Sequence, residues 1–117
     1  MSNDSPIVLI GIGTSGSAIA RNVNRAFGGG MRCILTDTDA STGQSEETFV
    51  LLGGDRLSGR GTGGDVVAGR LAAEDSAKLL DDHLCGVRIA VLATALGGGT
   101  GSGATLEIAK HLSERGT

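Results

Sequence analysis

The residues best suited to chemistry lie in the glycine-rich stretch Gly97-Gly98-Gly99-Thr100-Gly101-Ser102-Gly103. It follows the apolar run 89–93 and precedes a segment with apolar residues at helical spacing: Ala104, Ile108 and Leu112. Five glycines in seven positions indicate that bare backbone is required, because glycine loses the most freedom on folding. A glycine loop between a strand and a helix presents amide N–H groups to an anion, and Thr100 and Ser102 add hydroxyl donors. We therefore interpret the stretch as a phosphate-binding loop rather than a flexible linker.

A second stretch has the same order of elements. The apolar run 7–10 predicts a strand that is buried on both faces of a parallel sheet. It leads into Gly11-Ile12-Gly13-Thr14-Ser15-Gly16, and a helix should follow. The expected apolar face of this helix consists of Ile19, Val23 and Phe27, and its expected end is at Gly28-Gly29-Gly30.

The middle of the chain supplies two more strands and a third glycine-rich loop. Residues 33–35 predict a strand that ends at Thr36-Asp37-Thr38-Asp39, and 48–52 predict another. Between them, 40–47 predict a loop or a short helix. The loop 53–64 contains Thr62, Gly63 and Gly64 and precedes a helix expected over 66–83. The expected apolar face of that helix comprises Ala68, Leu71, Ala72 and Leu79.

The elements needed to position these loops form one α/β domain over residues 1–117. Alternating strand and helix patterns predict a Rossmann-like parallel sheet with right-handed crossovers and helices on both faces. Ligands bind beyond the carboxyl ends of such strands, where the strand order reverses. The expected strand order 3-2-1-4 places the loops after strands 1 and 4 side by side.

Composition narrows the class of partner. The chain has 117 residues, 39% of them hydrophobic, with a formal net charge of -3 and neither Tyr nor Trp. The negative net charge argues against a nucleic-acid partner, because proteins that bind nucleic acid carry a stripe of basic residues. No apolar run reaches the length of a membrane span, and residues 1–6 lack the basic flank of a signal peptide, so we expect a cytoplasmic protein. Cys33 and Cys85 sit singly, which favours two small buried residues over a metal or redox pair.

Taken together, the loops resemble those of the FtsZ and tubulin family of filament-forming GTPases. Residues 97–103 look like the signature loop of that family, and 59–65 with 69–74 resemble the FtsZ loop that senses the γ-phosphate. Thr38-Asp39-Ala40 is similar to the Asn-Thr-Asp-Ala after the second FtsZ strand. Because these motifs occur in the same order over nearly the whole chain, the resemblance is specific.

The resemblance implies binding of GTP or GDP with Mg²⁺, and a role for each loop. Asp39 would lie near the magnesium ion, through water, and a triphosphate needs such a hard cation. The residues implied to contact the phosphates are Gly11, Gly13, Thr14 and Gly16 in the first loop, Thr62, Gly63 and Gly64 facing the γ-phosphate, and Gly98, Gly99, Thr100 and Gly101 around the α- and β-phosphates.

The chain also departs from the family pattern. Thr14 and Ser15 interrupt the first glycine run, Ala18 stands near the position of an FtsZ asparagine, and Asp37 replaces another asparagine. A second carboxylate opposes anion binding unless magnesium or Arg60 offsets it. The family fold continues with further strands, a base-contacting helix and a second domain, so we expect residues 1–117 to be its N-terminal segment. The unpaired fourth strand should then be a site of association or aggregation.

Three functions remain open from the residues. The first is a GTP-binding module whose longer form assembles into filaments, with little or no hydrolysis by 1–117 because no residue matches the water-positioning acid. The second is an NAD-type dinucleotide-binding domain of an oxidoreductase, since Gly11, Gly13 and Gly16 fit the fingerprint and Asp37 follows Gly16 by about 20 residues. The third is a self-associating structural module without nucleotide. A Walker lysine motif is absent, and no catalytic residue is assigned.

Overall fold

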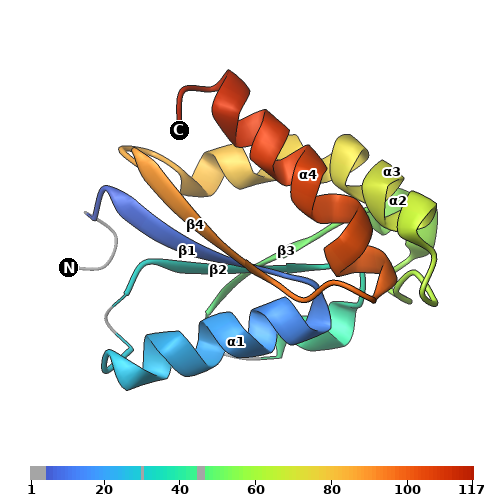
Figure 1. The fold of residues 1–117 in the computed structure, drawn as a ribbon, viewed down its shortest axis with the longest axis horizontal. Helices are drawn as coiled ribbons and strands as arrows, with labels where there is room; N and C mark the ends of the chain where they lie inside the picture. Colours follow the sequence, from blue (N-terminus) through green and yellow to red (C-terminus); the bar gives the residue numbers. More distant parts are fainter. Residues whose placement is uncertain (1–4, 30, 45–46) are drawn as a thin grey trace.

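Four parallel strands form one sheet in the order β3-β2-β1-β4 (Figure 1). The computed structural model describes residues 5–29, 31–44 and 47–117. The strands are β1 Ile7–Ile12, β2 Cys33–Asp37, β3 Thr48–Leu51 and β4 Ile89–Thr94. The predicted fold class and strand order are confirmed.

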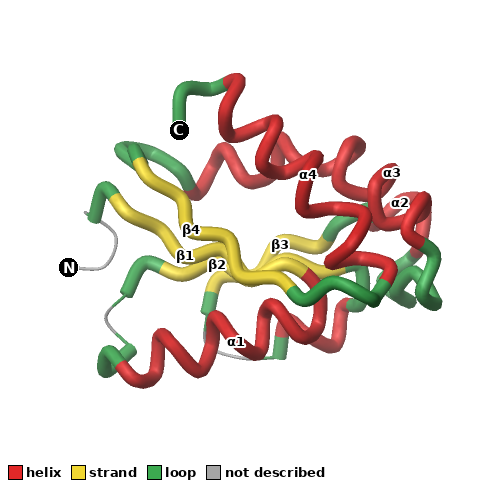
Figure 2. The backbone as a smooth tube through the Cα atoms, in the orientation of Figure 1, coloured by secondary structure: helices red, strands yellow, loops and turns green. Residues whose placement is uncertain are grey.

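Helices cover both faces of the sheet, as the sequence predicts (Figure 2). Helix α1 lies on one face, whereas α3, η3 and α4 lie on the other. The helical segments are α1 Gly13–Ala26, η2 Ala40–Gly43, α2 Gly54–Leu57, α3 Val66–Ser76, η3 Ala77–His83 and α4 Gly99–Glu114. This arrangement makes the sheet the middle of three layers.

Strand β1 separates two apolar cores. Val8, Ile10 and Ile12 are fully buried in the larger core, on the side of α3 and α4. Leu9 points to the opposite face and packs in a smaller core with Ala20 of α1. A central strand of a parallel sheet is covered on both sides, so its sequence is continuously apolar rather than alternating.

The predicted apolar faces of two helices are wrong in part. Ile19, Val23 and Phe27 are 46%, 36% and 69% exposed, because α1 approaches the sheet through small or polar residues instead. Those buried residues of α1 are Gly13, Gly16, Ser17, Ala20 and Asn24. On the next predicted helix, Leu79 is 52% exposed because α3 ends at Ser76 and the 3₁₀ turn of η3 rotates the following side chains. The face predicted for α4, Ala104, Ile108 and Leu112, is confirmed as buried.

The loops contain two short helical segments. The single-turn helix α2 within 53–64 was not predicted, whereas η2 at 40–43 agrees with the loop or short helix expected over 40–47. Helix α1 ends at Ala26, just before the predicted stop at Gly28-Gly29-Gly30, where Gly28 and Gly29 have positive φ angles. Gly30, part of the expected loop at 45–46 and the terminal segment 1–4 lie outside the described residues. These local differences leave the order of strands and helices unchanged.

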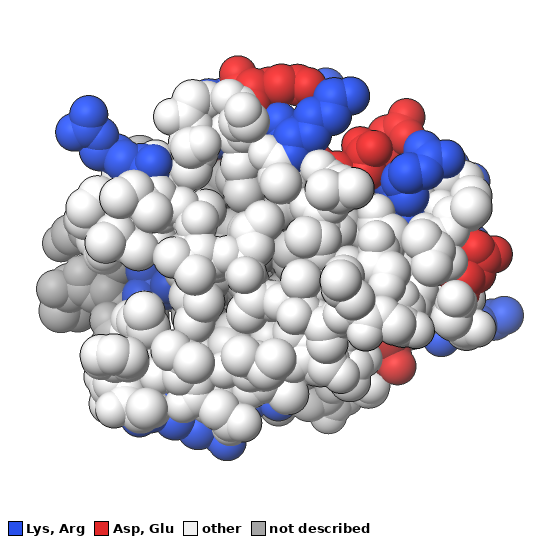
Figure 3. All heavy atoms as spheres, viewed as in Figure 1, with Lys and Arg blue, Asp and Glu red and all other residues white. Residues whose placement is uncertain are grey.

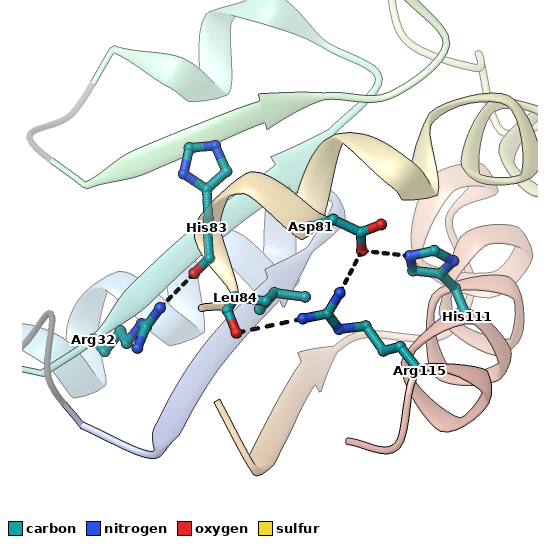
Figure 4. A network of polar contacts seen from close by, with 6 residues as sticks. All are labelled: Arg32, Asp81, His83, Leu84, His111 and Arg115. Atoms are coloured by element: carbon teal, nitrogen blue, oxygen red, sulfur yellow. Dashed lines mark hydrogen bonds and ion pairs between the residues drawn. The ribbon is translucent and has the colours of Figure 1, made fainter. Parts of the chain in front are cut away.

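Polar contacts fasten the carboxyl end of α4 to the segment that precedes β4 (Figure 4). Asp81 Oδ1 lies 2.7 Å from His111 Nε2 and accepts a hydrogen bond from Arg115 Nη1 at 3.1 Å. Two arginines also donate to main-chain carbonyls of this segment: Arg115 to Leu84 (3.4 Å) and Arg32 to His83 (2.8 Å). The contacts of His111 and Arg115 fix the end of α4 that lies away from its glycine-rich start, and the Arg32 contact ties the same segment to the start of β2.

The two cysteines differ from each other, which corrects the prediction that both are buried. Cys85 is exposed and Cys33 is partly buried, and both are free thiols. Burial, with a smaller contribution from the nearby Glu47 carboxylate, raises the pKa of the Cys33 thiol from 9.0 to about 11, and Arg21 opposes this increase.

We predict that Cys33 is alkylated much more slowly than Cys85. Only the thiolate reacts, and a pKa near 11 instead of 9.0 lowers the thiolate fraction of Cys33 about a hundredfold at pH 8. Mass spectrometry after iodoacetamide treatment at pH 8 measures both rates in one molecule, and urea-unfolded protein is the control. Equal rates for the two thiols in folded protein would contradict the prediction.

Strand β4 forms an apolar edge of the sheet. Among the described residues β4 pairs with β1, and its side chains Ile89 and Val91 are 54% and 50% exposed. The middle of the face seen in Figure 3 carries few charged side chains, which gather around the rim. The expectation that this edge associates with another chain stays a prediction. None of the described helices is long and apolar enough to span a membrane.

Candidate functional site

Loops that are far apart in the sequence meet at one cavity of about 300 Å³. It lies beyond the carboxyl ends of β1, β2 and β4. The loop after β1 contributes Gly13, the loop 59–64 contributes Gly63, and the start of α4 contributes Gly99. Because parallel strands end at the same edge of the sheet, their following loops share this position. The spatial convergence required of a common binding site is therefore present.

Two helix N-termini open onto this cavity. Helix α1 begins at Gly13 and α4 begins at Gly99, and neither has a side-chain cap or an acidic residue in its first turn. The first amides of an α-helix have no intrahelical acceptor and carry the positive end of the helix dipole. Two such ends at one cavity form a positive field made of backbone, which suits a polyanion.

Several glycines at the cavity are required by packing between backbones. A Cβ at Gly16 would overlap the carbonyl oxygen of Ala93, and one at Gly101 would overlap the carbonyl of Ala95. At Gly99 a Cβ would overlap the Thr62 hydroxyl and would lie 2.7 Å from the backbone nitrogen of Asp65. These glycines bring α1, α4 and the loop 59–64 close enough to share one cavity.

Other glycines of these loops have open space beside them. Gly63 and Gly64 have positive φ angles, and a Cβ at either position would have no neighbour within 4 Å. Gly98 also has no neighbour within 4 Å, although its φ of -92° suits any residue. The glycine-rich pattern thus combines close packing with backbone that is free to approach a ligand.

The hydroxyls of the α4 loop are engaged within the protein. Thr100 Oγ1 lies 2.7 Å from Thr38 Oγ1, and both residues are buried. Ser102 Oγ accepts a hydrogen bond from the Gly97 amide at 2.8 Å. The Thr38–Thr100 pair joins the end of β2 to the start of α4, so it fixes two walls of the cavity relative to each other.

Asp39 is a partly exposed acidic residue that lines the cavity. Its Oδ1 accepts hydrogen bonds from Ser41 Oγ at 2.7 Å and Ser41 N at 2.9 Å. These bonds, the hydroxyl first and the amide second, hold the pKa of Asp39 below its usual value against a smaller opposing effect of desolvation. An ionised carboxylate at a cavity is an oxygen ligand of the kind that Mg²⁺ prefers.

Asp37, in contrast, is 2% exposed and both of its carboxylate oxygens accept hydrogen bonds within the protein. Its Oδ2 accepts from Thr14 Oγ1 at 2.8 Å and from Thr42 Oγ1 at 2.7 Å, and its Oδ1 accepts from the Thr38 amide at 2.8 Å. A dinucleotide-binding domain needs this carboxylate to accept from a ribose hydroxyl. Here its acceptors already serve three protein donors.

The structure brings together most of the residues selected from the sequence. Those that line the cavity are Gly13, Thr14, Gly16, Asp39, Thr62, Gly63, Gly98, Gly99, Thr100 and Gly101. Gly11 does not line it, because it lies within β1 against Ser17, and Gly64 does not line it either. Sequence reasoning selected neither Thr38 nor Gly61 as a contact, although both adjoin selected residues.

Comparison with known families agrees with this geometry. The GTPase-domain model of the tubulin/FtsZ family matches residues 6–117. The chain belongs to the tubulin/FtsZ family. The family resemblance that the glycine-rich loops carry in the sequence is therefore confirmed.

Relatives of this tubulin/FtsZ family chain include curated cell division proteins named FtsZ. The protein of Caulobacter vibrioides (strain NA1000 / CB15N) is 35% identical over 112 residues, covering 94% of this chain and 22% of the relative. That of Helicobacter pylori (strain ATCC 700392 / 26695) is 35% identical over 113 residues, covering 94% of this chain and 29% of the relative. The chain spans less than a third of the length of these relatives.

Solved structures of the family share the fold of this chain. An empty FtsZ dimer from M. jannaschii superposes with a TM-score of 0.83 at 25% identity, covering 95% of this chain and 33% of that one. CetZ2 from Haloferax volcanii, in a GTPgS-bound protofilament, superposes with a TM-score of 0.80 at 29% identity, covering 92% of this chain and 36% of that one.

Proposed function

We propose that residues 1–117 hold the phosphates of a guanine nucleotide in a tubulin/FtsZ-type GTPase. The observation that carries the proposal is the meeting of two uncapped helix N-termini at one cavity of about 300 Å³. The family match supports guanine as the base, since the matching model is that of a GTPase domain. Hydrolysis and assembly into filaments are proposed for the longer protein.

Magnesium would be shared between the protein and the phosphates. The described residues contain no group of three or more His, Cys, Asp or Glu side chains that could hold a metal. Asp39 and the hydroxyls at the cavity are oxygen donors, and Mg²⁺ bound to nucleotides keeps several waters. These donors fit a hydrated ion that Asp39 contacts through water, and the bound ion would neutralise phosphate charge.

Each wall of the cavity has a distinct part in holding the ligand. The amides at the starts of α1 and α4 would bind phosphate oxygens, while the loop 59–64 would close the third side. The Thr38–Thr100 pair would keep these walls at a fixed separation. Because these groups are already held in place by the fold, ligand binding requires little reordering of backbone.

Thermal unfolding of residues 1–117 tests the proposal. GTP with Mg²⁺ at a hundred times its dissociation constant should stabilise the protein by about 2.7 kcal/mol, and tripolyphosphate should also stabilise it. NAD at the same concentration should have no effect. Stabilisation by NAD alone would instead support the oxidoreductase alternative. Dimers in the absence of any nucleotide effect would support the structural alternative.

A further inference from the structure

Asp37 links two segments that line the cavity to the short helix η2 beside them. Its buried carboxylate accepts hydrogen bonds from Thr14 at the start of α1, from Thr42 in η2 and from the Thr38 amide after β2. A carboxylate only accepts hydrogen bonds, so each of these partners must donate. The direction of each hydrogen bond follows from this chemistry.

This direction determines what the Thr14 hydroxyl offers to a ligand. A hydroxyl has one proton and two lone pairs, and the Thr14 proton is directed to Asp37 Oδ2 at 2.8 Å. Both residues line the cavity, but Asp37 is only 2% exposed, whereas Thr14 is exposed. The lone pairs of Thr14 Oγ1 are therefore the part of the hydroxyl that remains for the cavity.

We infer that Asp37 is a positioning residue that makes the Thr14 hydroxyl an acceptor, so that Thr14 binds an O–H donor of the ligand and not a phosphate oxygen. This inference rests on the proposed function. An ionised phosphate oxygen carries no proton, so it is the wrong partner for a lone pair. Within a magnesium nucleotide, O–H donors are the ribose hydroxyls and the waters on the metal ion.

The same contact separates the roles of side chain and backbone in the first loop. The amides at the start of α1 remain available to phosphate, because Asp37 engages only the hydroxyl of Thr14. Replacing Thr14 by valine keeps the shape of the side chain and removes only the hydroxyl. The substitution should spare phosphate binding and weaken only the ligands that supply the donor.

The test compares Thr14→Val with the unsubstituted chain and with Thr42→Val, by calorimetric titration. Thr42 donates to the same Asp37 oxygen at 2.7 Å but does not line the cavity, so it is the matched control. The ligands are GTP and tripolyphosphate, each with Mg²⁺ and each with EDTA, at a pH where the phosphates are fully ionised. One lost hydrogen bond should weaken binding about three- to tenfold.

The pattern of loss identifies the donor. If Thr14→Val weakens binding of both ligands with Mg²⁺ and of neither with EDTA, the donor is water bound to the metal ion. If it weakens binding of GTP with Mg²⁺ and with EDTA but never that of tripolyphosphate, the donor is a ribose hydroxyl. Both results support the inference. An equal loss with tripolyphosphate in EDTA, or no loss in any arm, would overturn it while leaving the proposed function intact.

Asp37→Asn provides a second, independent readout. An amide can donate to Thr14, which frees the hydroxyl proton to turn toward the cavity. In the Asp37→Asn variant, adding Thr14→Val should weaken binding of tripolyphosphate in EDTA about threefold or more. In the chain that keeps Asp37, Thr14→Val should leave this binding unchanged. The same small effect in both backgrounds would contradict the inference. Failure of the unsubstituted chain to bind any of the ligands would overturn the proposed function and this inference with it.

Discussion

Arg60→Glu is expected to weaken binding of magnesium GTP by about a hundredfold, equivalent to about 2.7 kcal/mol at 1.36 kcal/mol per tenfold change. Among the described residues, the charged ones that line the cavity are Asp37, Asp39 and Arg60, so Arg60 supplies the positive charge. Its backbone is fixed by the bridge to Asp39 and by donation from its amide to Leu57 O at 3.1 Å. A charged hydrogen bond contributes about 1.5–3 kcal/mol, and reversing the charge adds repulsion.

Arg70→Glu is the matched control for this effect. Arg70 is an exposed residue of α3 that pairs with Glu74 at 3.5 Å and does not line the cavity. Both substitutions change the net charge equally, so a general electrostatic effect would appear in both. Titration at two salt concentrations should show a smaller salt dependence for Arg60→Glu alone. Equal affinities for the two variants would refute a local role for Arg60.

Gly16→Ala is expected to lower the melting temperature by about 10 °C, for a loss of about 3 kcal/mol in the free energy of unfolding. An added Cβ would overlap the Ala93 carbonyl oxygen and lie 2.9 Å from Thr94 Cα. Both atoms belong to the backbone of β4, so neither can move aside as a side chain can. Helix propensity alone predicts the opposite sign, since alanine in a helix is favoured over glycine by about 1 kcal/mol.

Gly98→Ala is the control for Gly16→Ala. Gly98 lies at a φ of -92° with no neighbour within 4 Å of a built Cβ, so alanine should change the melting temperature little. Calorimetric unfolding of both variants without ligand measures the difference. For a domain of this size, about 3–6 °C of melting temperature corresponds to 1 kcal/mol of unfolding free energy. A melting temperature for Gly16→Ala within about 2 °C of the unsubstituted value would therefore exclude the packing role of Gly16.

The order and type of the main elements could be predicted from the sequence. Apolar runs such as 7–10 and 89–93 indicate buried parallel strands, because each run is followed by a glycine-rich loop and then by a helical pattern. Right-handed connections then leave few possible topologies, and the observed order β3-β2-β1-β4 is the predicted one.

The buried face of α1 could not be predicted in the same way. Periodicity selected Ile19, Val23 and Phe27 because large apolar residues are usually buried, yet α1 packs through Gly13, Gly16, Ser17 and Ala20. Small residues let α1 come close to the sheet, and at that short distance larger side chains no longer fit between them. The distance between a helix and a sheet depends on the residues of both, so it cannot be predicted from the apolar periodicity of the helix alone.

That exposed amides and a few hydroxyls follow the strands could be read from the glycine-rich stretches, because glycine is costly there unless bare backbone is needed. Which of these groups remain available to a ligand depends on how the loops pack against one another. Asp37, which from the sequence alone adds a charge that opposes anion binding, is 2% exposed and accepts from three protein donors. The reason is physical: hydrogen-bond partners are chosen by proximity in three dimensions, and Thr14 and Thr42 reach Asp37 only after the sheet has brought their loops together.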